Sequence, residues 1–467
     1  MPGAITRVNE DIINLIFESF DDVPVPESAR PLSIDTEYVK ARASFFFNCA
    51  LINRFFHRYS LPHLYRIIAV DQLASQRKVA ILELLREPLK KYGQYVWWLT
   101  TGSVGLGSFD VVREILPLLP NVKVLNISRT ASGLQSILNL VYNLERLSFG
   151  IECDAERENL LNRLIPRKMN ESRTALSACR AVELDWTIVD CHIFELLTKF
   201  SRVKCLTFGS SCKFKTDFTF VDEEELRREM IMAQKVFSTV SRLTFGMISA
   251  DKLHMLLPFF NNIKQLDVRF VRVISKDTVR LLSEHCTQLQ ELSFYSSSID
   301  KEAIEGLLLR PPPQLQALSM KYLSYNVTGT LLEMVNVHRI AAAHNKLQSI
   351  SLFGMIPPSL DALQALSTVL PNIRHLGFIM KIEYTAQELA HALVGFKKLS
   401  SVYIRRPLFS ESNDSQYQEC HRQLIHDLAV LLPEVNTIDC FSLRLMQHKN
   451  SQGVNECVTK TLQQGAI

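Results

Sequence analysis

The amino-acid sequence predicts an α/β fold in which a short helical N-terminal domain precedes a right-handed solenoid. We expect about 13 parallel strands on the concave face of this solenoid. Three observations predict it. A short apolar phrase recurs thirteen times between residues 92 and 441, helical patterns fill the intervals, and residues 1–70 lack the phrase.

The recurring phrase is an apolar residue, two variable residues, an aliphatic anchor, one small residue and a further apolar one. VKVLNI, from Val122, and LQELSF, from Leu289, are examples. The anchors are Leu99, Leu125, Leu147, Leu184, Leu206, Leu243, Leu266, Leu292, Leu318, Ile350, Leu376, Val402 and Ile438. Their mean spacing of about 28 residues is typical of strand–helix repeats that each form one layer of a solenoid.

Helical patterns separate the phrases. FDVVREILPLL (109–119), LDALQALSTVL (360–370) and AQELAHALVGF (386–396) carry apolar residues at steps of three and four. Pro or Asn often follows, where a helix has to end. Strand, turn and helix therefore alternate through the repeats.

These features resemble the leucine-rich-repeat family over residues 92–441. The Asn or Cys that follows the strand in that family is mostly missing, so we expect an irregular solenoid. The wide spacings predict insertions near residues 151–178, 210–236, 322–342 and 406–420.

Residues 1–70 have a different organisation. VNEDIINLIFESF (8–20) predicts an amphipathic helix, and an inserted proline-bearing loop is expected at about 21–38. Helical patterns continue to about residue 70, and residues 71–91 are expected to form a linking helix. Residues 442–467 are assigned to a C-terminal cap or a flexible tail.

The N-terminal residues resemble the F-box motif. Val8–Ile12 fall on its Leu-Pro-x-Glu-aliphatic start, Ile16-Phe17 on its Ile-Phe pair, and Leu51–Phe56 on its Leu-Val-x-Arg-x-Trp/Phe helix. Asn9 stands where the family has Pro, and the stretch between Phe20 and Ile52 is longer than in a compact motif.

The F-box resemblance implies a non-catalytic substrate receptor of an SCF-type ubiquitin ligase, with a Skp-type adaptor and, through it, a cullin as partners. The implied adaptor-binding residues are Val8, Ile12, Ile16, Phe17, Leu51, Ile52 and Phe56. Each of them could instead pack on the first repeat, and a leucine-rich-repeat scaffold unconnected with ubiquitin is the alternative function.

Strand alternation identifies the residues that would face a substrate. The position three after each anchor is mostly Gly or small in the first repeats, but it carries basic and aromatic side chains in the later ones. Arginine and aromatic residues are common hot spots, and basic groups favour acidic or phosphorylated segments. The candidate substrate residues are Arg269, Tyr295, Lys321, Phe353, Tyr403 and Arg405, unless inserted loops cover them.

Composition limits the other function classes. The 52 basic residues nearly balance the 48 acidic ones, so nucleic-acid binding would need a local patch such as Arg54, Arg58 and Arg66 among the aromatic residues of 50–70. None of the ten cysteines forms a C-x-x-C pair, and Cys420 and His426 do not share a helix face, so we expect no metal site and no cofactor. No signal peptide, membrane span or catalytic triad is apparent, which favours a non-enzymatic protein of the cytoplasm or nucleus.

Overall fold

The computed structural model describes most of the repeat region and two N-terminal helices. The described residues are 36–52, 54–69, 85–100, 108–130, 137, 140–141, 143–151, 178–185, 187–215, 223–269, 271, 274–295, 299–321, 346–353, 359–379, 384–405, 415–440, 443–449 and 455–461. The chain divides into two compact units, Met1–Gly246 and Met247–Ile467, which are described in turn.

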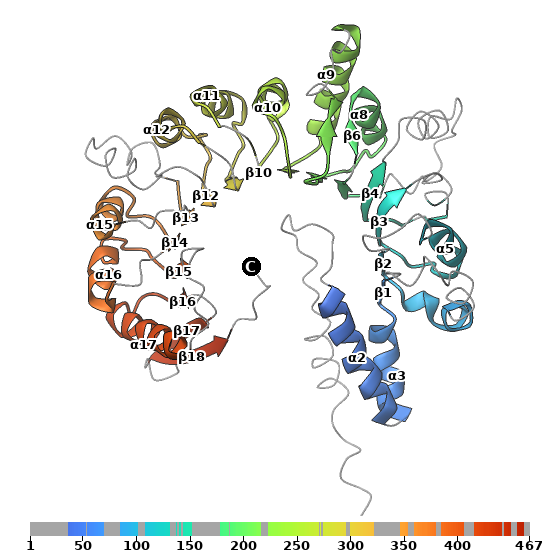
Figure 1. The fold of residues 1–467 in the computed structure, drawn as a ribbon, viewed down its shortest axis with the longest axis horizontal. Helices are drawn as coiled ribbons and strands as arrows, with labels where there is room; N and C mark the ends of the chain where they lie inside the picture. The colour runs from blue at the N-terminus through green and yellow to red at the C-terminus, as the bar shows by residue number, and fades with distance from the viewer. Residues whose placement is uncertain are drawn as a thin grey trace, which may run out of the picture. The chain divides into compact units, whose positions relative to one another are not determined.

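The first unit begins with two helices, α2 (Thr36–Ile52) and α3 (Arg54–Leu64), which pack against each other (Figure 1). Phe46 is fully buried between them, and its ring lies 5.1 Å from the His63 ring in a stacked arrangement. The partly buried residues around Phe46 are Phe45, Cys49, Phe56, Tyr59 and Leu64. We call these two helices the α2–α3 hairpin.

The α2–α3 hairpin continues directly into the repeat sheet. Strand β1 (Ile67–Ala69) follows it and pairs in parallel with β2 (Trp98–Thr100). The Trp97 and Trp98 amides donate to the Arg66 carbonyl at 2.9 and 3.0 Å. The sequence pattern missed β1, because three residues are too few to show the repeated phrase. Helical residues 85–92 and the 3-10 turn η1 (Gly93–Tyr95) precede β2.

The sheet of the first unit is parallel throughout, in the order β1-β2-β3-β4-β5-β7-β9. Its further strands are β3 (Val124–Thr130), β4 (Arg146–Ile151), β5 (Ala181–Leu184), β7 (Cys205–Phe208) and β9 (Arg242–Phe245). Helical elements α5 (Ser108–Ile115), η2 (Leu116–Leu118), α8 (Cys191–Thr198) and α9 (Glu223–Phe237) lie between the strands. The short strands β6 (Ile188–Val189) and β8 (Lys213–Phe214) form a separate parallel pair.

The register corrects one predicted anchor. Leu147 of β4 pairs with Val182 of β5, which in turn pairs with Leu206 of β7, so Val182 and not Leu184 is the anchor of this repeat. Both side chains are buried and, two residues apart, both point into the core. The alternation of apolar residues therefore cannot distinguish them, and only pairing with the neighbouring strands does.

Five phenylalanines form the core beneath β7 and β9. Phe208 and Phe245 stack with their ring centroids 5.3 Å apart, Phe194 of α8 and Phe214 of β8 contact this pair, and Phe237 of α9 packs on Phe194. None of the five has measurable solvent exposure. Large aromatic rings that interdigitate in this way supply much of a repeat core's stabilisation.

The second unit repeats the same architecture with greater regularity. Its strands are β10 (Gln265–Arg269), β11 (Glu291–Tyr295), β12 (Ala317–Lys321), β13 (Ser349–Phe353), β14 (His375–Ile379), β15 (Ser401–Arg405) and β16 (Thr437–Cys440). All pair in parallel in chain order, and their anchors Leu266, Leu292, Leu318, Ile350, Leu376, Val402 and Ile438 form one buried ladder. The predicted α/β repeat fold is confirmed.

Helices line one side of this sheet in Figure 1, and we call the opposite side the inner face. They are α10 (Ala250–Leu256), α11 (Lys276–His285), α12 (Lys301–Leu309), α15 (Leu360–Val369), α16 (Ala386–Leu393) and α17 (Ser415–Leu431), with the 3-10 turn η5 (Leu257–Phe259) after α10. Beyond β16, β17 (Leu443–Lys449) and β18 (Asn455–Thr461) continue the sheet in antiparallel pairing, within the segment that the sequence assigned to a cap or tail.

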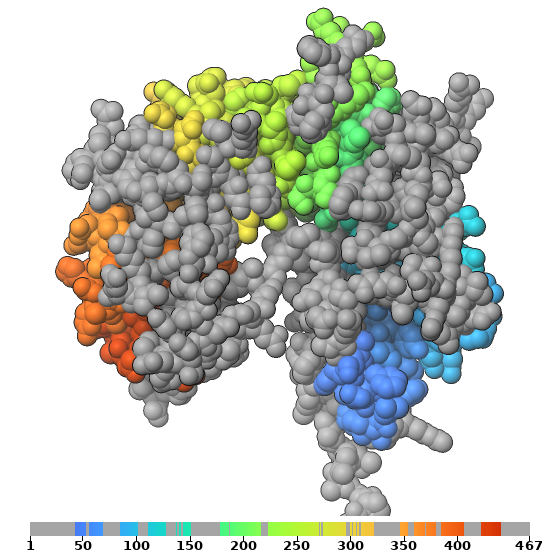
Figure 2. All heavy atoms as spheres, viewed as in Figure 1, coloured from blue at the N-terminus to red at the C-terminus, as the bar shows by residue number. Residues whose placement is uncertain are grey.

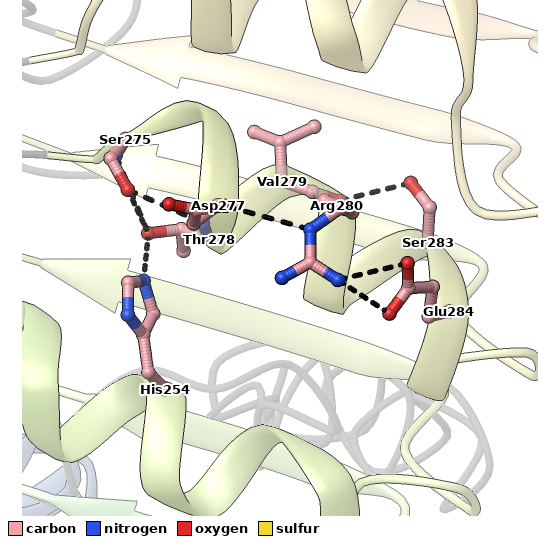
Figure 3. Close-up of polar contacts among 8 residues, drawn as sticks. All are labelled: His254, Ser275, Asp277, Thr278, Val279, Arg280, Ser283 and Glu284. Atoms are coloured by element: carbon pink, nitrogen blue, oxygen red, sulfur yellow. Dashed lines mark hydrogen bonds and ion pairs between the residues drawn. The ribbon is translucent and has the colours of Figure 1, made fainter.

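Side-chain caps start most of these helices. The hydroxyls of Ser249, Ser275, Ser359 and Thr385 each accept a backbone N–H of the first turn. At α11, Ser275 and Thr278 form a reciprocal capping box, and Thr278 Oγ1 also lies 2.6 Å from Nε2 of His254 on α10 (Figure 3). On the same helix, Arg280 binds Glu284 with two hydrogen bonds of 3.1 and 3.0 Å. The cap thus links consecutive repeats as well as satisfying the helix end.

Candidate functional site

An exposed apolar surface lies on α2. Phe47, Leu51 and Ile52 are 54%, 67% and 63% exposed, although all three are large hydrophobic side chains. Phe47 and Leu51 are four residues apart and therefore neighbours on one side of the helix. Phe46 and Ala50, one residue before each, are buried. We call Phe47, Leu51 and Ile52 the α2 outer face. Figure 2 shows atoms of the hairpin, in blue, on the visible surface of the molecule.

The α2 outer face contains only some of the residues that the F-box resemblance assigned to adaptor binding. Leu51 and Ile52 belong to it, whereas Phe56 packs against Phe46 inside the hairpin. Val8, Ile12, Ile16 and Phe17 lie outside the described residues. Phe47 was missed by the sequence reasoning, although its spacing to Leu51 was the signal that could have identified it.

The basic residues that prompted the nucleic-acid alternative have separate environments. Arg66 lies with its guanidinium carbon 5.3 Å from the centre of a Trp97 ring, at the junction between the hairpin and β2. Arg58 is exposed on α3. Beside the junction, the Tyr65 and Tyr92 rings stack at 4.9 Å. The aromatic residues of this region therefore join the hairpin to the first repeat.

A second surface lies on the inner face of the second unit. The strand register aligns four of the six predicted substrate residues in one row, in the order Arg269, Tyr295, Lys321, Phe353. Arg405 continues the same row opposite Ile379, and Tyr403 lies two residues earlier on β15. The sequence-based placement of these residues on one face is therefore consistent with the register.

The row divides into two parts with different side-chain contacts. Arg269 donates to Asp267 Oδ2 from both Nε and Nη2, at 2.9 and 2.6 Å. Lys321 and Arg405 both approach the ring of Phe353, with Nζ at 6.0 Å and the guanidinium carbon at 5.0 Å from its centroid. Cations over an aromatic face are attracted by the ring quadrupole.

Phe353 is the centre of this second part and is only 2% exposed. The Tyr403 ring meets it edge-on at 5.5 Å, and Arg405 also lies over Tyr403 at 5.4 Å. A Cβ at Gly377 would come within 2.7 Å of Phe353 Cζ, so the ring lies where any other residue would place a side chain. We call Lys321, Phe353, Gly377, Tyr403 and Arg405 the inner-face cluster.

The inner-face residues of the first unit are less accessible. The residues directly after its anchors include Thr100, Asn126, Ser148, Glu183 and Thr244, and all are at most 9% exposed. Of their counterparts in the second unit, Asp267, Ser293 and Ser351 are half-buried, whereas the Ser319 hydroxyl and Asp439 are buried. Accessible polar side chains at this position therefore occur on only some strands of the second unit.

Cys191, His192 and Asp190 lie close together, as in the nucleophile sites of cysteine enzymes, but their surroundings do not activate the thiol. Cys191 Sγ lies 3.6 Å from His192 Nδ1, and the same nitrogen lies 3.3 Å from Asp190 Oδ2. Burial, Asp190 and Glu225 raise the pKa of the Cys191 thiol to about 11. Since the thiolate is the reactive form, this thiol is protonated and unreactive near neutral pH. Among the described residues, no group of His, Cys, Asp and Glu could hold a metal ion.

Three buried thiols should make the stability of the folded chain depend on pH. Burial raises the pKa values of Cys179, Cys212 and Cys286 to about 12 from an ordinary value of 9.0. The neutral thiol is favoured in the folded state, so this contribution to stability is complete below pH 9 and is lost as the pH rises from 9 towards 12. We expect these three cysteines to resist iodoacetamide at pH 8.5 until denaturant is added, as measured by mass spectrometry of each peptide. Rapid native labelling of any of them would contradict their burial.

No family model and no curated protein matches this chain. Among solved structures, a complex of TLR13 with ssRNA13 aligns with 74% of the chain at 14% identity and a TM-score of 0.40, and the chain spans 44% of that protein. A chain of the yeast Rad7 and Elc1 complex aligns with 94% of this chain, and the alignment covers 94% of that chain, at 13% identity and a TM-score of 0.40. No described helix has the length and hydropathy needed to cross a bilayer.

Proposed function

We propose that this chain is a non-catalytic substrate receptor of an SCF-type ubiquitin ligase. In this proposal the α2–α3 hairpin docks on a Skp-type adaptor, which connects it to a cullin, and the inner face of the repeats binds a protein substrate. The transfer chemistry belongs to other subunits. Such a receptor would act in the cytoplasm, the nucleus or both.

The observation that carries the proposal is the α2 outer face. Exposed Phe47, Leu51 and Ile52 occupy a helix that the F-box resemblance assigns to adaptor binding. Each such side chain gains about 1.5–3 kcal/mol when it moves from water into an apolar interface. Clustered large apolar side chains on a helix surface are typical of protein interaction sites.

The interior of the hairpin supports a binding role for the α2 outer face, because other residues hold the two helices together. Phe46, Phe56, Tyr59 and Leu64 form its small core, so the hairpin does not need Phe47, Leu51 or Ile52 to hold its two helices together. Pairing of β1 with β2 then attaches the hairpin to the first repeat. A bound adaptor would therefore be connected to the repeats through paired backbone.

Co-purification with a Skp-type adaptor tests this function. The wild-type chain should retain the adaptor, and Phe47→Asp or Leu51→Asp should weaken binding by at least about thirtyfold, the effect of losing one interface hot spot. Val430→Asp is the matched control, because Val430 is 79% exposed on α17 in the other unit. Ile16→Asp extends the test to the sequence-based part of the motif.

Circular dichroism of each variant distinguishes lost binding from lost folding. The proposal would be overturned if the wild-type chain does not bind the adaptor, or if binding survives both α2 substitutions. In the first case the scaffold function unconnected with ubiquitin becomes the better explanation.

A further inference from the structure

A row of basic residues lies in the first unit, where strands β5, β7 and β9 begin. The Lys204 amide donates to the Arg180 carbonyl at 2.8 Å, and the Arg242 amide donates in turn to the Lys204 carbonyl at 2.9 Å. The three residues are therefore neighbours along one edge of the sheet, about 5 Å apart from strand to strand. The side chains of Arg180 and Lys204 are exposed, and that of Arg242 is half-buried.

Two helices end at the same edge and add further basic residues. Helices α8 and α9 pack side by side and lead into β7 and β9 (Figure 1). Lys199 is the C-cap residue of α8, Arg202 follows in the turn to β7, and Lys235 lies in the last turn of α9. All three are exposed. We call the resulting set the basic edge, which consists of Arg180, Lys199, Arg202, Lys204, Lys235 and Arg242.

The side chains of the basic edge have no acidic partner. Lys204 Nζ donates to the Thr239 carbonyl oxygen at 3.2 Å, and Arg242 hydrogen-bonds the Cys205 thiol. Burial raises the pKa of this thiol, so it is neutral near pH 7 and does not cancel the guanidinium charge. The other four side chains form no hydrogen bond or ion pair in the part of the chain that the structure describes.

Nearby negative groups leave much of this charge in excess. Glu195 on α8 and Glu183 on β5 are the closest acidic residues along the described chain, and Glu145, before β4, is paired with Lys123. The carboxyl ends of α8 and α9 each contribute roughly half a negative charge. Six positive charges against about three negative ones leave roughly three. Residues 152–177, which lie outside the described residues, contain as many basic as acidic residues and so add no net charge.

The turns that lead into β7 and β9 offer charges and hydroxyls but no apolar anchor. Their apolar residues Phe200, Val203 and Val240 are at most 3% exposed, whereas Ser201 is exposed. Protein partners usually bind through aromatic or apolar hot spots, and single-stranded nucleic acid through accessible rings on which bases stack. Neither is present here. Lys, Arg and Ser side chains are instead the usual contacts to the phosphates of a duplex.

We infer that the basic edge binds the phosphate backbone of duplex nucleic acid without reading its sequence. This inference goes beyond the proposed function and does not depend on it. A duplex carries one negative charge per roughly 1.7 Å of its axis, so the roughly 10 Å from β5 to β9 lies opposite several phosphates. The nearly balanced charge of the whole chain is compatible with such binding, because a local patch is sufficient.

Fluorescence anisotropy with the full chain and a fluorescein-labelled duplex DNA tests the inference. We expect the affinity to be independent of base sequence and to fall about fortyfold from 50 to 200 mM salt, the dependence for about three neutralised phosphates. Lys199→Gln and Arg202→Gln should each weaken binding about fivefold to tenfold at roughly 100 mM salt, and lower the salt slope by about one. Lys397→Gln is the matched control, because it removes an exposed positive charge from the turn before β15 in the other unit.

Three competitors, added at equal charge concentration, distinguish the duplex from other polyanions. They are single-stranded DNA of the same length, poly-glutamate and vesicles that contain phosphatidylserine. The duplex should bind best, because its charge density is about twice that of one strand. The inference would be overturned by absence of duplex binding, by tighter binding of any competitor, or by an unchanged affinity and salt slope in both Lys199→Gln and Arg202→Gln. An equal loss in Lys397→Gln would also overturn it.

Discussion

Replacing Phe208 by Ala should lower the free energy of unfolding by about 3–5 kcal/mol, because a large, fully buried ring leaves a cavity. Phe208 has no solvent exposure, and its ring lies 5.3, 5.5 and 6.3 Å from the rings of Phe245, Phe214 and Phe194. Truncation therefore removes contacts with β9, β8 and α8 at once. The cavity would lie within one repeat layer, where the surrounding strands can relax only in part.

Urea denaturation followed by circular dichroism measures the effect of Phe208→Ala. Phe47→Ala is the matched control, because it deletes the same side chain from a site that is 54% exposed and should change stability by less than about 0.5 kcal/mol. A loss below about 1 kcal/mol at Phe208 would show that the five rings do not form a close-packed core. An equal loss at both positions would contradict the solvent exposure of Phe47.

The adjacent residues Phe46 and Phe47 should give opposite results when each is changed to Ala. Phe46→Ala should destabilise the α2–α3 hairpin by about 3–5 kcal/mol, since Phe46 is fully buried and contacts Phe45 and His63. Phe47→Ala should leave the hairpin folded while weakening adaptor binding in the proposed function. One helix would thus supply a folding residue and a binding residue at consecutive positions.

Hydrogen exchange of the α2 and α3 amides distinguishes these two outcomes. Phe46→Ala should accelerate exchange in the hairpin more than in the repeats, and Phe47→Ala should leave it as in the wild type. Adaptor binding of Phe46→Ala should recover at lower temperature if the loss comes from unfolding. Fast exchange in both variants would mean that Phe47 belongs to the hairpin core.

The repeat fold was predictable because it is encoded in local patterns. Anchors such as Leu266 and Leu292 recur with the same neighbours, and hydrophobic burial requires each to face the core. The error at β5 shows the limit of this signal. Val182 and Leu184 face the same way, so their identity as anchor depends on pairing with Leu147 and Leu206.

The candidate sites were predictable only to the level of a face. Spacing placed Lys321, Phe353 and Arg405 on the inner face, and the register agrees. It could not reveal that Arg269 donates to Asp267 or that both other cations approach Phe353, because those contacts depend on side-chain direction across several strands. Likewise, the N-terminal resemblance selected Leu51 and Phe56 together, although Leu51 is exposed and Phe56 packs against Phe46 inside the hairpin.

The repeat period, the alternation of strands with helices and the face on which each strand residue lies can be derived from the order of residues, because they follow from the periodic burial of apolar side chains. Which aromatic residues of α2 and α3 pack inward and which remain exposed became known from the folded arrangement of the two helices. The same holds for Lys321 and Arg405, which are distant in the chain but both lie close to the Phe353 ring. Both depend on contacts between elements, and these form only when the neighbouring helices and strands are in place.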